Sequence, residues 1–135
     1  MTNCEKLLEF PSELENISRV EKLIDEISVT HNLSSEIYGK ISVAIIEAVN
    51  NAILHGNKLD TSKKVRIEYN IEEDYINFAV EDEGIGFDFQ NIPDPTLPEN
   101  IEKTHGRGIF LMNHLADGIE FNENGALVEM KFKLE

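Results

Sequence analysis

A long run of apolar residues at helical spacing does most to limit how this chain can fold. Between Ser34 and His55, apolar side chains recur every three or four residues, which is the pattern of a helix with one buried face. Ser34 or Ser35 can cap its start, and Gly56 is a plausible end. The apolar face consists of Ile37, Ile41, Ala44, Ile45, Ala48 and Ala52. Such a face requires a second layer of structure to cover it.

Alternating apolar and polar residues predict the strands of this second layer. The runs 65–71 and 76–80 alternate in this way, and the short link between them favours an antiparallel hairpin. A first strand is expected at 7–10, ended by Pro11, and a closing hairpin at 119–134 with its turn at Asn-Gly. These runs predict a sheet that is mostly antiparallel.

Two further helices complete the expected layers. Ser12 and Glu15 form a Ser-x-x-Glu capping box ahead of an apolar stripe, so a first helix should begin there and fade near His31. A third helix is expected at 108–116, after a run at 88–105 that has no clean periodicity and is interpreted as a loop. The sum is an α+β fold, a two-layer α/β sandwich, with a mixed but mostly antiparallel sheet and about three helices on one face.

Length and composition set outer bounds on partners and compartment. The 135 residues fit one domain, 1–135, with one core. There is no run of about 18 apolar residues and no signal-peptide pattern, so neither a transmembrane helix nor export is expected. The single cysteine, Cys4, excludes an intrachain disulfide and favours a cytoplasmic location. The net charge of −14 repels nucleic acid and anionic membranes, so we expect neither as a direct partner.

Polar residues on the long helix indicate a ligand. Glu47, Asn51 and His55 are spaced by four residues and share one line along the helix. Asn is a poor residue inside a helix, so its presence favours a function, and Asn51 can offer its side-chain oxygen to Mg²⁺. Glu47, one turn earlier, would hold or deprotonate a nucleophile near the γ-phosphate of a nucleotide. The alternatives are an ordinary solvated stripe and, for His55, a C-terminal helix cap.

Two glycine segments would complete a nucleotide pocket. Asp82 follows a strand and can accept a hydrogen bond from the adenine amino group, while Gly84 and Gly86 let the backbone approach the base. Gly106-Arg107-Gly108 is expected to open the third helix, whose first amides would bind phosphate. Thr104 and the arginine could add a hydroxyl and a positive charge. The alternatives are a tight turn after a strand and a flexible hinge before a helix.

These residues resemble the GHKL ATPase superfamily, which includes sensor histidine kinases, gyrase B subunits and MutL-type repair proteins. The segment 47–56 is similar to its N box, 82–87 to its first glycine box and 106–112 to its second. Residues 125–128 weakly resemble its last signature. The resemblance covers nearly the whole chain and is closest to anti-sigma factor serine kinases of the RsbW and SpoIIAB type. Their Glu-Ala-Val-x-Asn-Ala-x-x-His-Gly pattern is met at every position.

The resemblance implies the Bergerat fold and a mechanism. Proteins of this type sequester a sigma factor and phosphorylate a serine of a STAS-type anti-anti-sigma partner, using ATP and Mg²⁺. By position, Glu47 would be the general base, Asn51 would hold Mg²⁺ and Asp82 would read adenine. The pocket would be shaped by Gly84, Gly86, Gly106 and Gly108. The family is often dimeric, and the sequence leaves open whether this chain forms a homodimer.

Two other functions remain open on the sequence alone. A nucleotide-gated binding module that sequesters a partner without significant phosphotransfer would carry the same pocket residues. A structural scaffold with a vestigial pocket would carry them too. Glu47 favours the kinase, because a protein that only binds has little need of a carboxylate at that position.

Overall fold

Five strands and three α-helices make up most of the chain that the computed structural model describes, namely residues 6–84, 104–122 and 126–134. The strands are β1 (Lys6–Pro11), β2 (Lys64–Glu72), β3 (Tyr75–Glu81), β4 (Gly118–Asn122) and β5 (Leu127–Lys133). The helices are α1 (Ile17–His31), α2 (Ser35–Asn51) and α3 (Thr104–Leu115). A 3₁₀ turn, η1 (Leu14–Asn16), precedes α1, and a π-helical turn, η2 (Ala52–Gly56), continues α2.

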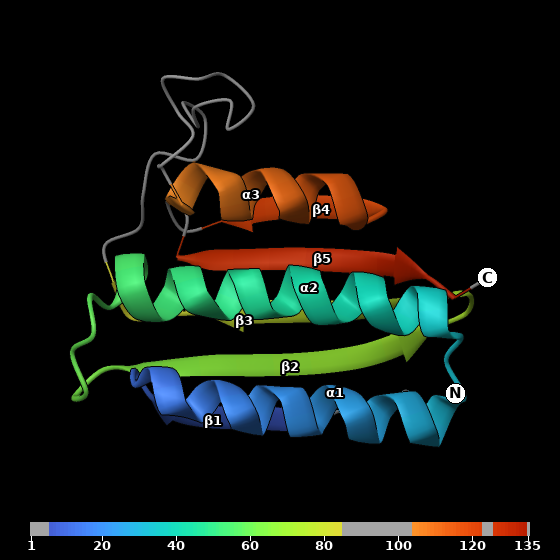
Figure 1. Cartoon of the computed structure of the whole chain (residues 1–135), viewed down its shortest axis with the longest axis horizontal. Coiled ribbons are helices and arrows are strands. Elements are labelled where there is room, and N and C mark those ends of the chain that lie inside the picture. Colours follow the sequence, from blue (N-terminus) through green and yellow to red (C-terminus); the bar gives the residue numbers. More distant parts are fainter. Residues whose placement is uncertain (1–5, 85–103, 123–125, 135) are drawn as a thin grey trace.

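The strands form one sheet in the order β1-β2-β3-β5-β4. All three helices lie on the same face of this sheet, with α2 between α1 and α3 (Figure 1). The two-layer prediction is therefore confirmed. Within the described residues every strand pairing is antiparallel, so the parallel pairing that a mixed sheet would need is not found there.

Burial follows the periodicities that the sequence shows. In β2, Val65, Ile67 and Tyr69 are buried and alternate with more exposed residues, as a sheet with one covered face requires. In α2 every residue of the predicted apolar face is buried, and Val49 and Ile53 join the same core. The helix layer and the sheet thus share a single hydrophobic core.

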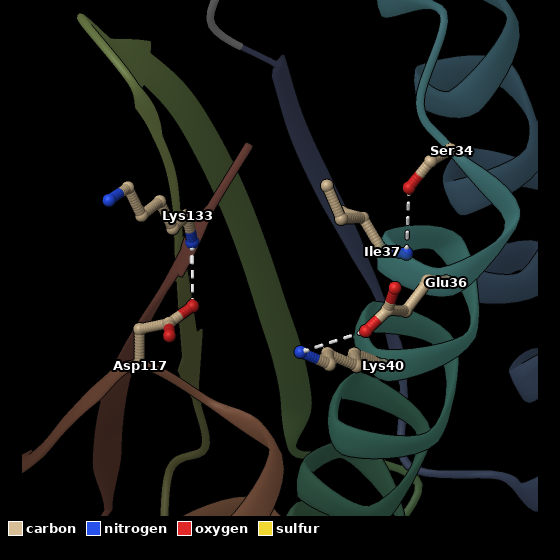
Figure 2. A network of polar contacts seen from close by, with 6 residues as sticks. All are labelled: Ser34, Glu36, Ile37, Lys40, Asp117 and Lys133. Atoms are coloured by element: carbon tan, nitrogen blue, oxygen red, sulfur yellow. Dashed lines mark hydrogen bonds and ion pairs between the residues drawn. The ribbon is translucent and has the colours of Figure 1, made fainter. Parts of the chain in front are cut away.

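The start of α2 and the end of α1 are where the sequence places them. The Ser34 hydroxyl oxygen accepts a hydrogen bond from the backbone N–H of Ile37 at 3.2 Å, which caps α2 (Figure 2). Asn32 ends α1 in the left-handed region at φ 53°, a conformation that Asn tolerates better than most residues. Asp117 directly precedes β4, and its carboxylate accepts a hydrogen bond from the backbone N–H of Lys133 at the end of β5 at 2.7 Å (Figure 2). This bond links the start of β4 to β5.

Two predicted helix starts are wrong. Ser12 does not form a capping box, because its side chain is fully buried and its hydroxyl donates to the Lys63 carbonyl at 2.9 Å. The chain instead enters α1 through η1, and neither η1 nor α1 has a side-chain cap at its N-terminus. The third helix begins at Thr104 rather than at Gly108, so two glycines that disfavour helix lie inside its first turns. The rest of the predicted loop, and the Asn124-Gly125 turn, lie outside the described residues.

The continuous helical segment Ser35–Gly56 is long and apolar enough, by length and composition alone, to cross a membrane. Its apolar face is the one that packs on the sheet in the hydrophobic core. The composition is therefore that of a central core helix, which passes the same test.

Candidate functional site

The polar line on α2 lies at the C-terminal end of the helix, where the helix widens into η2. Glu47, Asn51 and His55 are all half-buried. The π-helical turn was not predicted, and such turns are frequent at functional sites. Burial lowers the pKa of the His55 imidazole below its ordinary value. A neutral imidazole interacts less with the helix dipole than a charged one, which weakens the alternative of a simple charged cap.

Gly108 brings the start of α3 against Glu47 and Asn51. A methyl group on Gly108 would lie 2.8 Å from Glu47 Oε1 and 3.4 Å from Asn51 Nδ2. The missing side chain therefore lets the two helices approach at this point. Gly108 of the second glycine segment and the polar line of α2, which are far apart in sequence, lie side by side in the structure.

Asn51 carries a buried polar group without a partner. Its Nδ2 atom is buried and has no hydrogen bond within the described part of the chain. Leaving such a group unpaired costs roughly 1–3 kcal/mol, so the arrangement indicates a ligand. Rotation of the amide by a half-turn exchanges its oxygen and nitrogen, so the same position can present the oxygen that a hard cation needs. The residue therefore fits the predicted magnesium ligand.

Asp82 lies at the end of β3 in direct contact with the end of η2. A side chain on Gly56 would overlap the Asp82 carboxylate, and one on Gly84 would overlap the Gly56 carbonyl. The Asp82 Oδ1 atom accepts a hydrogen bond from the Gly84 N–H at 2.8 Å. The two glycines thus permit a contact between the N-box segment and the first glycine segment.

Asp82 and Asn51 line the same small cavity, of about 20 Å³. Its other lining residues are apolar and come from α2, α3 and the sheet. The cavity is far smaller than a nucleotide, so it can receive only a group at the inner end of a bound ligand. Burial raises the pKa of the Asp82 carboxyl to about 6, and the Gly84 N–H opposes this shift. Above that pH the carboxylate is ionised and can accept from an amino group.

A hollow of about 520 Å³ lies on the other face of the sheet, away from these residues. Its lining includes four carboxylates, from Glu68, Glu72, Glu120 and Glu129. An acidic lining repels phosphate. We therefore place the candidate site at the smaller cavity between α2, α3 and β3, despite its smaller volume.

Some predicted site residues are placed only in part. Thr104, Gly106 and Arg107 lie in the first turns of α3, and only their backbone is described. Gly86 lies outside the described residues. Sequence analysis did not single out Asn57, which is buried and accepts a hydrogen bond from the Glu83 N–H at 2.8 Å. An amide residue directly after the predicted helix stop at Gly56 was the available signal.

Comparison with protein families gives one match that spans most of the chain. The model of the histidine kinase-like ATPase domain matches residues 10–132. The anti-sigma F factor of Clostridium perfringens is 38% identical over 100 residues, which cover 70% of this chain and 71% of that protein. The serine-protein kinase RsbW of Oceanobacillus iheyensis is 27% identical over 132 residues, which cover 93% of this chain and 84% of that protein.

A solved structure shows the same fold. The structure of the RsbU and RsbW domains of a Mycobacterium tuberculosis protein matches 96% of this chain with a TM-score of 0.64. The chain spans about a third of that longer protein, 31%, and the sequence identity is 11%. At this identity the likeness supports the fold alone.

The raised pKa of Asp82 predicts a pH dependence of folding. The folded chain holds a proton between about pH 4 and 6 that the unfolded chain, with a pKa near 3.8, has released. The free energy of unfolding should therefore fall as pH rises through this window and level off above it. Urea denaturation of the native chain and of Asp82→Asn across this range measures the effect, with Glu120→Gln, an exposed carboxylate away from the site, as control. If the free energy of unfolding varied with pH in the same way in the native chain and in Asp82→Asn, the assignment of the raised pKa to Asp82 would be contradicted.

The contact at Gly108 predicts separate effects on stability and binding. Gly108→Ala should change the free energy of unfolding by no more than about 1 kcal/mol, because alanine favours the helix. Its methyl group should displace Glu47 and Asn51 and weaken Mg-ATP binding by about tenfold or more, or about 1.4 kcal/mol. Gly39→Ala is the matched control, since a methyl group there meets nothing within 4 Å. Calorimetry that shows equal affinities for the two variants would refute the contact's role.

Proposed function

We propose that this chain, which belongs to the histidine kinase-like ATPase family, is an ATP-dependent serine kinase and anti-sigma factor. The observation that carries the proposal is the meeting of three segments around Asn51. Asn51 of α2 and Asp82 at the end of β3 line one cavity, and Gly108 of α3 lies against Asn51 and Glu47. The relatives named as anti-sigma F factor and serine-protein kinase RsbW support the same function.

Asp82 would bind the adenine end of ATP. Its Oδ1 atom is held by the Gly84 N–H, so the carboxylate has a fixed orientation at the cavity. A carboxylate accepts from the adenine amino group, whereas guanine presents a carbonyl at that position and would be repelled. A charge-assisted hydrogen bond of this kind contributes roughly 1.5–3 kcal/mol.

Asn51 and the first turns of α3 would bind the phosphate end. The unpaired amide of Asn51 would hold Mg²⁺ through its oxygen. The bound ion neutralises charge on the phosphates, which the net charge of −14 would otherwise repel. The free amides of the first turn of α3, those of residues 104 to 106, would bind phosphate oxygens, while Gly108 would shape the pocket. Arg107 and Thr104 would add a positive charge and a hydroxyl.

Glu47 would act as the general base. It would take the proton from the hydroxyl of the partner's serine as the serine oxygen bonds to the γ-phosphorus. The bond from that phosphorus to the bridging oxygen breaks, and ADP leaves. Gly108 lies directly against the Glu47 carboxylate, so the start of α3 sets the position of this base. His55 would lie at the edge of the nucleotide site.

The partners follow from the same proposal. The chain would sequester a sigma factor and would phosphorylate a STAS-type anti-anti-sigma protein, whose unphosphorylated form competes for the kinase. A homodimer stays a prediction from the resemblance. The acidic charge disfavours nucleic acid and anionic membranes as direct partners, and a cytoplasmic location stays a prediction from the sequence.

The base assignment predicts a loss of phosphotransfer without a loss of binding. Glu47→Gln keeps the size of the side chain but removes the base, so the rate should fall by about 10²–10⁴. Transfer of γ-labelled phosphate to a STAS protein measures the rate, and calorimetry measures Mg-ATP affinity. Glu120→Gln, which changes an exposed carboxylate away from the site, is the control.

Three outcomes would count against this function. Full phosphotransfer by Glu47→Gln would refute the base assignment. Tight Mg-ATP binding without phosphotransfer by the native chain would favour a nucleotide-gated binding module. If the native chain did not bind Mg-ATP, the remaining hypothesis would be a structural scaffold with a vestigial pocket.

A further inference from the structure

Asn57 is an unusual residue for its environment. It is 1% exposed, and among the described residues the core holds only one other buried polar side chain, Ser12. Buried amides are costly unless each polar atom has a partner. A residue retained at such a place is expected to hold something in position.

The Asn57 amide is fully hydrogen-bonded, and its bonds reach three separate segments. Nδ2 donates to the Ser12 hydroxyl oxygen at 2.7 Å and to the Lys64 carbonyl at 3.0 Å. Oδ1 accepts from the Glu83 N–H at 2.8 Å. These partners lie after β1, at the start of β2 and after β3. The amide thus joins η2, which it directly follows, to three strand ends.

A closed ring of hydrogen bonds makes this junction rigid. The backbone N–H of Lys64 donates to the Glu83 carboxylate at 2.8 Å, while the Lys64 carbonyl accepts from Asn57. Asn57 in turn accepts from the Glu83 N–H. Ser12 anchors the ring to the neighbouring backbone, because its hydroxyl accepts from Asn57 and donates to the Lys63 carbonyl. Only an amide of this length offers two donors and one acceptor here.

The ring fixes the turn that carries Asp82. Three successive backbone N–H groups, those of residues 82, 83 and 84, each have one acceptor. These are the Ala126 carbonyl at 2.9 Å, Asn57 Oδ1 at 2.8 Å and Asp82 Oδ1 at 2.8 Å. The middle bond is the only one of the three that reaches a side chain elsewhere in the chain. Removing it would free the turn directly after Asp82.

We infer that Asn57 is the positioning residue for the base-reading carboxylate, and that it sets the selectivity of the site for a 6-aminopurine nucleotide without touching the nucleotide. The inference rests on the proposed function, since it assigns base reading to Asp82. A side chain on Gly56 would overlap that carboxylate and one on Gly84 would lie 3.0 Å from its Oδ1 atom, so both segments contact it and a shift of the turn moves it. Small misplacements of a positioned group can cost up to about 100-fold in function.

The test compares ATP with inosine triphosphate, which carries a carbonyl in place of the 6-amino group. We expect the native chain to prefer ATP, and Asn57→Ala to reduce the ratio of the two affinities by about tenfold. Ser12→Ala removes two of the four side-chain hydrogen bonds of Asn57 and Ser12 but keeps the bonds from Asn57 to Lys64 and Glu83, so it should fold and reduce the ratio by less. Asn77→Ala is the matched control, because its amide bonds Asn70 at 3.0 Å outside the site. Melting temperatures are measured for every variant.

The outcomes separate this inference from the proposed function. A lower melting temperature with an unchanged affinity ratio, in Ser12→Ala and in the folded fraction of Asn57→Ala, would show a purely structural role and overturn the inference. If the native chain binds ATP but does not discriminate against inosine triphosphate, base reading by Asp82 fails and the inference fails with it. If the native chain does not bind ATP, the proposed function fails first. A reduced ratio in both variants, with the control unchanged, is the result we expect.

Discussion

The close contact between η2 and the turn after β3 is the constraint on which the candidate site depends. Gly56 lies against the Asp82 carboxylate and Gly84 lies against the Gly56 carbonyl, so neither glycine can carry a side chain without moving the other segment. This contact fixes the end of α2 over the end of β3. Because α2 also packs along the sheet, the position of Asn51 and Glu47 relative to Asp82 is set by the hydrophobic core.

The electrostatics of the site pull in opposite directions. The chain is strongly acidic, and both Glu47 and Asp82 would face a ligand that is itself an anion. Two features oppose this repulsion: the amides at the start of α3 and the metal site suggested by the unpaired Asn51 amide. The free energy of binding would therefore depend on the metal, while Asp82 would contribute mainly selectivity.

Much of this arrangement could be predicted from the sequence. Period-two and helical spacings give the strands, the apolar face of α2 and the two-layer class, because burial on one face imposes these periods directly. Asn51 and Asp82, which come from two of the motifs, line one cavity, and Glu47 lies against Gly108 of the third. Local signals failed where distant residues decide: Ser12 matches a capping box, yet it bonds to Lys63, which is remote in sequence. Asn57 was missed for the same reason, since all its partners are set by tertiary structure.

The most direct test of the site is a crystal structure of the chain with Mg²⁺ and a non-hydrolysable ATP analogue. We expect the adenine amino group within hydrogen-bond distance of the Asp82 carboxylate, the metal on the Asn51 side-chain oxygen, and Glu47 facing the γ-phosphate. We also expect the ring of hydrogen bonds among Asn57, Lys64 and Glu83 to be the same as in the free chain. A nucleotide bound elsewhere, or one whose base does not contact Asp82, would contradict the assignment of this site.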